Sequence, residues 1–175
     1  MPNAAPKAAL EPLRASDACL ELVKAFESCL QPVKGRPGFF RSYLDPVGVR
    51  SIGYGHTNHH LPRFDGNTVW SQAQCDAALV GDMGTFERWV SDHARVSLKQ
   101  CEFDALVSWS FNTGGPATAT LWKKLNAGNK AAIPAELAKW NRGGGKVLAG
   151  LVRRRKAEGL MFAGKIEEAL AVAHG

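Results

Sequence analysis

The first amphipathic segment of the chain predicts a helix over residues 20–30. Ser16 and Asp17 suit the cap at its N-terminus, and apolar residues follow at helical spacing: Leu20, Val23 and Phe26. Glu27 lies near the end of this helix. Residues 31–38 contain two prolines and two glycines, which break a helix, so this segment is predicted to be a loop.

A different pattern fills residues 39–57, where aromatic and β-branched residues alternate with proline and glycine. Such a pattern predicts short antiparallel strands joined by tight turns. Asp45 begins one of these turns, Asp45-Pro-Val-Gly, which has proline at its second position. Glu27 and Asp45 therefore place two carboxylates on two different elements.

The remainder of the chain has a helical pattern. Ser71 caps a helix predicted over residues 72–93, with Asp76 and Asp82 facing out. Residues 98–111 are apolar on nearly every side, which predicts a buried central helix, and Asn112-Thr-Gly-Gly-Pro supplies its C-terminal stop. Shorter helices are predicted over residues 119–126, 134–140, 151–162 and 166–173.

Together these elements predict an α+β protein, mostly helical, with a small antiparallel β lobe and a cleft where the lobes meet. We expect a flexible arm over residues 1–15 and a single domain over residues 16–175. Within that domain, the β lobe is expected at about residues 39–65 and the helical lobe at about residues 71–175.

Composition narrows the class of protein. The 175 residues are 45% hydrophobic, which excludes a disordered chain, and contain neither a membrane-spanning apolar run nor the apolar core of a signal peptide. The net charge of +6 suits an anionic partner: nucleic acid, a membrane surface or an acidic wall polymer. The basic run at residues 153–156 is predicted to be a solvated helix face.

The cysteines and histidines give no sign of a metal or cofactor. The cysteines form no C-x-x-C pair, and a reducing compartment favours free thiols at Cys19, Cys29, Cys75 and Cys101. Three histidines cluster at His56, His59 and His60, without a second group of ligands. We therefore expect no metal site and no cofactor.

Two carboxylates brought from different elements to one cleft are the minimum equipment for hydrolysing a glycosidic bond. Ala25-Phe-Glu27 and Tyr43-Leu-Asp-Pro-Val-Gly-Val-Arg-Ser-Ile-Gly-Tyr-Gly-His56 resemble the active-site segments of phage-type lysozymes, the endolysins of glycoside hydrolase family 24. Further blocks follow in the family's order: Phe111-Asn-Thr-Gly-Gly, Leu121-Trp-Lys-Lys-Leu, Trp140-Asn-Arg-Gly-Gly-Gly and Glu158. The resemblance extends from about residue 16 to residue 170.

This resemblance implies a lysozyme-like fold and a muramidase that lyses the host cell. Such an enzyme hydrolyses the β-1,4 bond between N-acetylmuramic acid and N-acetylglucosamine in peptidoglycan. It implies Glu27 as the general acid, kept protonated by a partly apolar cleft, Asp45 as base or electrostatic stabiliser, and Ser51 as the holder of a water. The expected substrate contacts are Tyr54, His56 and Asn112. His56 also fits a structural role, as a hydrogen-bonding histidine.

The resemblance also implies where the protein works. It would be made in the host bacterial cytoplasm and reach the cell wall after release through a holin-like pore. We expect a monomer without a nucleic-acid partner and without stable membrane insertion.

Two departures from the family pattern keep other functions open. Seventeen residues separate Glu27 from Asp45, nine more than in the family, and serine replaces threonine at Ser51. The extra residues are expected to lengthen a hairpin or overhang the cleft, where Lys34, Arg36 and Arg41 would offer positive charge. The alternatives are a lytic transglycosylase and an inactive wall-binding or virion protein, with a nucleic-acid-binding protein the weakest.

Overall fold

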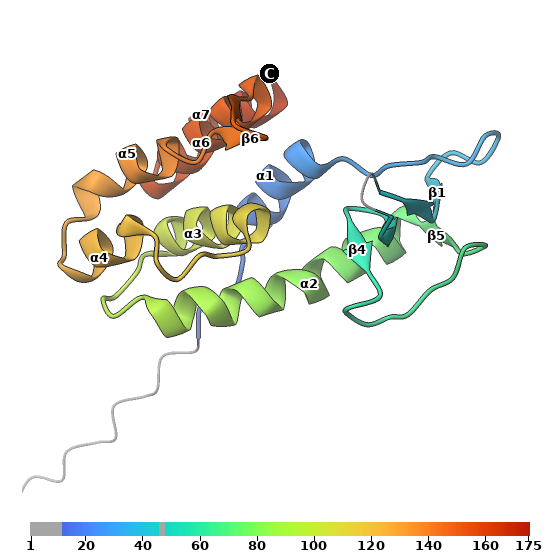
Figure 1. Cartoon of the computed structure of the whole chain (residues 1–175), viewed down its shortest axis with the longest axis horizontal. Helices are drawn as coiled ribbons and strands as arrows, with labels where there is room; N and C mark the ends of the chain where they lie inside the picture. Colours follow the sequence, from blue (N-terminus) through green and yellow to red (C-terminus); the bar gives the residue numbers. More distant parts are fainter. Residues whose placement is uncertain (1–11, 46–47) are drawn as a thin grey trace, which may run out of the picture.

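The computed structural model describes residues 12–45 and 48–175. Helices form one lobe, short strands gather at the opposite end, and a long helix runs along both (Figure 1). The helices are α1 (Asp17–Glu27), α2 (Gln72–His93), α3 (Gln100–Thr113), α4 (Thr120–Asn126), α5 (Ile133–Ala138), α6 (Ala149–Phe162) and α7 (Ile166–His174), with a 3-10 turn at Lys130–Ala132. The predicted α+β class is confirmed.

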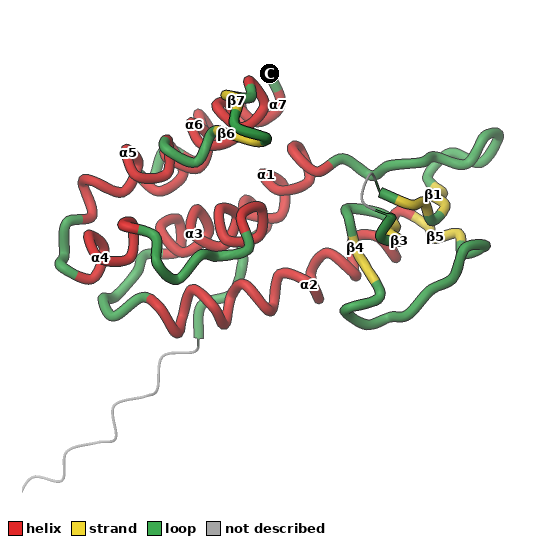
Figure 2. The backbone as a smooth tube through the Cα atoms, in the orientation of Figure 1, coloured by secondary structure: helices red, strands yellow, loops and turns green. Residues whose placement is uncertain are grey.

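Within the described residues, the strands form three small antiparallel sheets (Figure 2). In the β lobe, β1 (Phe39–Arg41) pairs with β5 (Val69–Ser71), and β3 (Arg50–Ile52) lies between β2 (Tyr43–Leu44) and β4 (His56–Thr57). A third pair, β6 (Arg142–Gly143) with β7 (Lys146–Val147), lies in the helical lobe. The β lobe therefore extends to Ser71, beyond the predicted end at residue 65.

Capping residues in the sequence correctly predicted where α2 begins and where α3 ends. The Ser71 side chain accepts from the Gln74 amide while the Gln74 side chain accepts from the Ser71 amide, so a full capping box starts α2 at the predicted residue. The predicted stop of the central helix is also confirmed, since Gly114 follows α3 in the left-handed conformation with φ 76°.

The first helix ends earlier than predicted. α1 stops at Glu27, and Ser28 leaves the helix with φ 51°. At its other end, Ser16 caps α1 and its hydroxyl donates to Asp104 of α3 at 2.6 Å, which fixes the helix against the centre of its lobe. Glu27 is thus the last helical residue, at the point where the chain crosses to the β lobe.

The predicted loop at residues 31–38 is a hairpin. The Val33 amide donates to the Phe39 carbonyl at 2.8 Å, and the Arg41 amide donates to the Gln31 carbonyl at 3.0 Å. Its second arm continues into β1, where Phe40 is paired with Trp70. The hairpin projects from the β lobe, away from the helical lobe (Figure 1).

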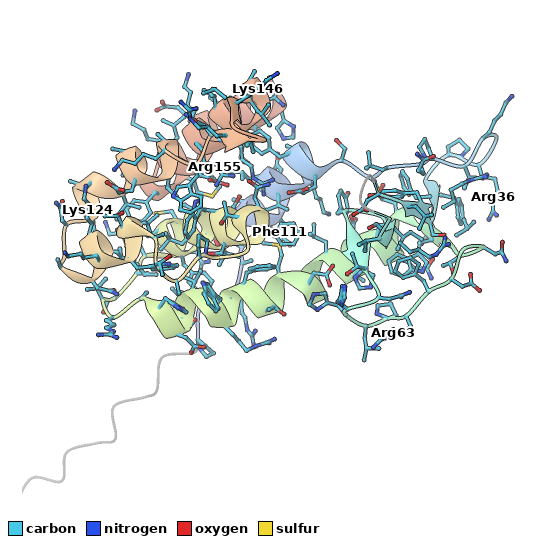
Figure 3. All side chains as sticks on the ribbon, in the orientation of Figure 1. Arg36, Arg63, Phe111, Lys124, Lys146 and Arg155 are labelled. Atoms are coloured by element: carbon cyan, nitrogen blue, oxygen red, sulfur yellow. The ribbon has the colours of Figure 1, made fainter. Side chains whose placement is uncertain are left out.

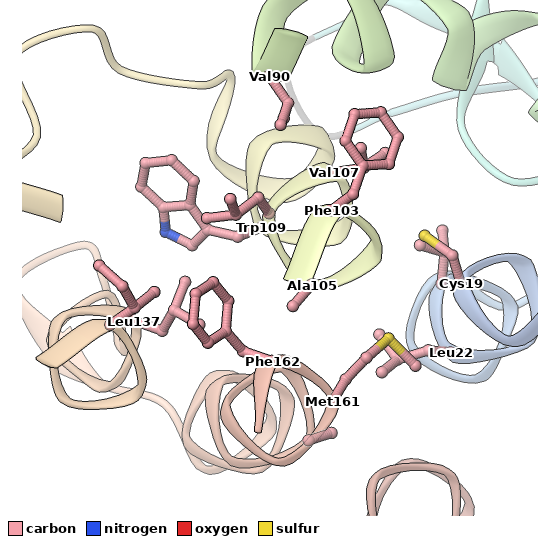
Figure 4. Packing of buried hydrophobic residues seen from close by; sticks show 14 of the residues in the cluster. Cys19, Leu22, Val90, Phe103, Ala105, Val107, Trp109, Leu137, Met161 and Phe162 are labelled. Carbon is pink, nitrogen blue, oxygen red and sulfur yellow. The ribbon is translucent and has the colours of Figure 1, made fainter. Parts of the chain in front are cut away.

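Each lobe has its own apolar core. In the helical lobe, α3 is central as predicted, with Phe103, Leu106 and Trp109 at most 1% exposed. Side chains of α1, α3, α5 and α6 converge on this core (Figure 4). A smaller cluster under the β lobe contains Ile52, Trp70, Cys75 and Ala78. The cleft lies between these two cores.

Two predictions about charged side chains are wrong. Asp82 was expected to face out, but it is 7% exposed because it binds His56. The basic run was expected to be solvated, which is correct for Arg153 and Lys156, but Arg154 and Arg155 are 2% and 1% exposed. Their burial is possible because both pair with the buried Glu158 of the same helix, and Arg154 also pairs with Glu27 of α1.

Part of the expected N-terminal arm is packed against the domain. Leu13 and Ala15 contact the main core, and the Ala15 amide donates to Glu87 at 2.8 Å. Residues 1–11 of that arm lie outside the described residues. Over the ranges that are described, no helix is long and apolar enough to cross a membrane.

Candidate active site

A cavity of about 270 Å³ opens where the two lobes meet. Its walls come from the end of α1, the turn between β3 and β4, the middle of α2 and the end of α3. The lining residues are Glu27, Tyr54, Gly55, Thr57, His60, Asp82, Phe86, Phe111 and Asn112. Figure 3 shows Phe111 at the end of α3 that is directed towards the β lobe. Three of the predicted site residues, Glu27, Tyr54 and Asn112, are thus brought together.

Glu27 is held by a buried arginine. The Arg154 guanidinium donates to Oε1 of Glu27, whose side chain is 25% exposed. Arg154 itself is 2% exposed. The surroundings of Glu27 thus combine an ion pair with Arg154 and a cavity that is partly apolar, since Phe86 and Phe111 also line it.

A second arginine holds the other side of the cavity. The Arg155 guanidinium donates to Oδ1 of Asn112, and Arg155 is labelled within the helical lobe in Figure 3. Glu158 connects the two arginines. Its Oε1 lies 3.2 Å from Nε of Arg154 and its Oε2 lies 2.9 Å from the Arg155 guanidinium. One buried carboxylate thus neutralises two arginines that reach two different cavity residues.

Burial shapes the protonation of this network. Glu158 is 0% exposed. Its burial raises its pKa, while Arg155, Arg154 and the Ser108 hydroxyl act in the opposite direction. Burial likewise lowers the pKa of Arg155, and Glu158 opposes that effect. The charges at this site therefore depend on one another, as expected for ions that share a poorly hydrated space.

Asp45 lies on the β side, at the turn between β2 and β3. Its Oδ1 accepts from the Val49 amide at 2.8 Å, which fixes the carboxylate at the turn. Burial raises the pKa of the neighbouring Tyr43 hydroxyl, and the charges of Asp45 and Glu27 both add to that rise. Unlike Glu27, Asp45 is not among the described residues that line the cavity between the lobes.

Ser51 and Tyr54 occupy different depths in the β lobe. Ser51 is 3% exposed, and its hydroxyl donates to the Val49 carbonyl at 3.5 Å, outside the cavity lining. Tyr54 lines the cavity, and its hydroxyl accepts from Gln72 at 2.8 Å. Burial and the charge of Asp76 raise the pKa of Tyr54 to about 12, so this hydroxyl is neutral at physiological pH.

His56 lies behind the cavity and does not line it. The residue is 2% exposed, with Nδ1 at 2.9 Å from Asp82 and Nε2 at 3.0 Å from the Pro62 carbonyl. Both ring nitrogens thus have hydrogen-bond partners within the protein, so neither is available to a sugar. The geometry fits the structural role that was considered for His56, since it ties β4 to α2.

Several residues of the site were not anticipated from sequence. Thr57, His60 and Phe86 line the cavity, and Asp82 lines it while binding His56. Arg154 and Arg155 were read as part of a solvated run. The signal that could have revealed them was Glu158, spaced four and three residues from the two arginines, as expected for pairing along a helix.

A larger cavity, of about 500 Å³, lies elsewhere on the helical lobe. It is formed mainly by α5 and α6, and none of the described residues that line it carries a carboxylate. The cavity between the lobes remains the candidate active site because the predicted residues Glu27, Tyr54 and Asn112 line it.

The phage lysozyme family model matches residues 38–158 of this chain. An endolysin of Bacillus phage B103 is 39% identical over 114 residues, which is 64% of this chain and 42% of that protein. A SAR-endolysin of Bacteriophage PS119 is 33% identical over 121 residues, which is 68% of this chain and 71% of that protein. The chain thus spans less than half the length of the Bacillus phage relative.

Solved structures agree with this match. The muramidase domain of SpmX from Asticaccaulis excentricus superposes with a TM-score of 0.71 at 29% identity, over 86% of this chain and 97% of that domain. The fold is therefore lysozyme-like. The chain belongs to the phage lysozyme family. Glu27 precedes the matched segment, so its assignment to the site depends on its position in the cavity and its contact with Arg154.

Proposed function

We propose that this protein is an endolysin-type muramidase, which hydrolyses the β-1,4 bond between N-acetylmuramic acid and N-acetylglucosamine in peptidoglycan. One observation carries the proposal: the carboxylate of Glu27 enters the cavity between the lobes, held there by the buried Arg154. The names of the relatives, endolysin and muramidase domain, give it independent support.

Glu27 is the proposed general acid. Its position at the last residue of α1 directs the carboxyl group into the cavity, where it can protonate the glycosidic oxygen of the leaving sugar. Arg154 fixes the direction of the side chain. After cleavage the carboxylate is negative, and the adjacent guanidinium stabilises that charge.

Asp45 is the proposed base on the opposite side. Fixed at its turn by the Val49 amide, it would accept a proton from the water that attacks the anomeric carbon. Ser51 on β3, whose Cα is paired with that of Tyr43, would help to hold this water. Attack from the side opposite the leaving group gives inversion of configuration, which is the stereochemistry we propose.

The remaining cavity residues would bind the sugar. Tyr54 presents a ring and a neutral hydroxyl, and Asn112 presents an amide whose oxygen is held by Arg155. His56 would act indirectly, through the position of β4. We further propose that the protein acts as a monomer, is made in the host cytoplasm and reaches the wall through a holin-like pore.

The decisive experiment is the clearing of outer-membrane-permeabilised bacteria, followed by turbidity. Glu27→Gln and Asp45→Asn should each lower the initial rate by about 10²-fold or more, because each loses a proton-transfer group. Glu21→Gln is the matched control, since Glu21 lies on the same helix with a 51% exposed side chain. If Glu27→Gln clears cells as fast as Glu21→Gln, Glu27 is not the acid.

Mass spectrometry of the released fragments distinguishes hydrolysis from transglycosylation. Hydrolysis leaves reducing muramic acid ends, whereas a transglycosylase leaves anhydro-muramic ends and needs only one acid. Anhydro ends as the main product would refute the hydrolase. A wild type that clears nothing would favour an inactive wall-binding protein.

A further inference from the structure

Cys29 and Cys75 lie together beneath the β lobe, although they are far apart in the sequence. Cys29 follows α1, two residues after Glu27, and Cys75 lies near the start of α2. Cys75 belongs to the small core of the β lobe and Cys29 packs against that core, where each thiol is close enough to act on the pKa of the other. Cys75 is 1% exposed, whereas Cys29 is partly exposed.

The surroundings restrict where the two sulfur atoms can go. A Cβ atom at Gly53 would lie only 3.0 Å from Sγ of Cys75, so the tight turn at Gly53 limits the space on that side of the thiol. The other two cysteines have different neighbours. Cys19 donates to the Asp104 carbonyl at 3.3 Å, and Cys101 lies near Gly164. They provide internal controls.

The position of this pair matters for the fold. The chain enters the β lobe through the segment after α1, which contains Cys29, and leaves it through α2, which contains Cys75. A covalent bond between the two residues would close a loop of roughly 45 residues that contains the whole β lobe, and such closure restricts the unfolded chain.

We propose that Cys29 and Cys75 form an oxidation site, at which a disulfide joins the two chain connections between the lobes. The co-reactant is a disulfide-containing oxidant such as glutathione disulfide. In a reducing compartment the two residues stay thiols, and in an oxidising one they become a bond that stabilises the β lobe next to the cleft.

The chemistry requires two exchange steps. The more accessible Cys29 loses its proton and attacks glutathione disulfide, which releases one glutathione and leaves a mixed disulfide. Cys75 then loses its proton and attacks Sγ of Cys29, which releases the second glutathione. Two electrons and two protons pass from the protein to the two glutathione thiols. Burial raises the pKa of both cysteines, so the steps should be slow at neutral pH.

The test treats the reduced protein with glutathione disulfide, blocks the remaining thiols, and maps peptides by mass spectrometry. The wild type and Cys101→Ser should each lose two hydrogen masses and yield a peptide that links Cys29 to Cys75. Oxidation should also raise Tm by roughly 5–10 °C. Cys29→Ser, at the more exposed member of the pair, should show neither change.

Other outcomes overturn the proposal. Two free thiols at Cys29 and Cys75 after prolonged oxidation would do so, as would glutathione retained on Cys29 or a linked peptide that includes Cys19 or Cys101. These readouts need no substrate, so they are independent of whether the protein is a muramidase.

Discussion

Removing the charge of Glu158 should destabilise the protein more than any other single change of Glu to Gln. Glu158 is 0% exposed and is the carboxylate that Arg154 and Arg155 share. In Glu158→Gln, the shape of the side chain is almost unchanged, but two buried guanidinium groups lose their common counter-ion. Glu27, at 25% side-chain exposure, then remains as the partner of Arg154.

The magnitude follows from the cost of an uncompensated buried charge. Breaking a buried ion pair by removing one partner costs about 3–5 kcal/mol. For a domain of this size each kcal/mol lowers Tm by roughly 2–4 °C, so Glu158→Gln should lower Tm by roughly 6–20 °C. The surface pair of Lys165 with Glu168 offers the matched control, because its side chains are 55% and 60% exposed. Glu168→Gln should change stability by less than about 1 kcal/mol.

Thermal and urea unfolding followed by circular dichroism measure both variants. The two variants remove the same charge, so the difference between them isolates burial. If the free energies of unfolding of Glu158→Gln and Glu168→Gln differ by less than about 1 kcal/mol, the arginines do not need Glu158 as a counter-ion, and the reasoning fails. At equal concentrations of folded protein, Glu158→Gln should also clear cells more slowly than the wild type, because Arg154 and Arg155 position Glu27 and Asn112.

Two further predictions concern stability. Ser71→Ala removes the hydroxyl that accepts from the Gln74 amide, so it should lower the free energy of unfolding, measured in urea, by about 0.5–2 kcal/mol. An unchanged urea midpoint would contradict the capping role. Hydrogen bonds and ion pairs with Lys124 and Lys139 lower the pKa of Glu136 in the folded protein. The ionised Glu136 therefore stabilises the fold above its unfolded pKa of about 4.3. This stabilisation is lost as the pH falls through the lower folded pKa. The Tm difference between wild type and Glu136→Gln should therefore shrink between about pH 5 and pH 3. A constant difference would refute the ion pairs.

Much of the fold could be predicted because its signals are local. The capping residues of α2 and the left-handed glycine after α3 act within a few residues of themselves, and both were located correctly. The motif around Asp45 and Tyr54 identified the family through its own order of residues. Glu27 was singled out by its flanks, although the family match begins only at residue 38.

The hairpin after α1 was predicted only in part. Proline and glycine indicated an irregular segment, and a longer hairpin was one of the expected outcomes. Its pairing with β5, however, depends on contacts such as Phe40 with Trp70, which lie far apart in the sequence. The same limit explains why β6 and β7, only two residues each, were missed.

The sequence by itself determined the helices, the lysozyme-like class and the identity of the two candidate carboxylates, because periodicity, caps and motifs are properties of neighbouring residues. Only the tertiary structure decided which charges are buried. Arg154 is paired with Glu27, which is 127 positions away in the sequence, and Asp82 is paired with His56, which is 26 positions away. A charged side chain is stable in the interior only opposite a specific partner, and folding alone brings that partner into place.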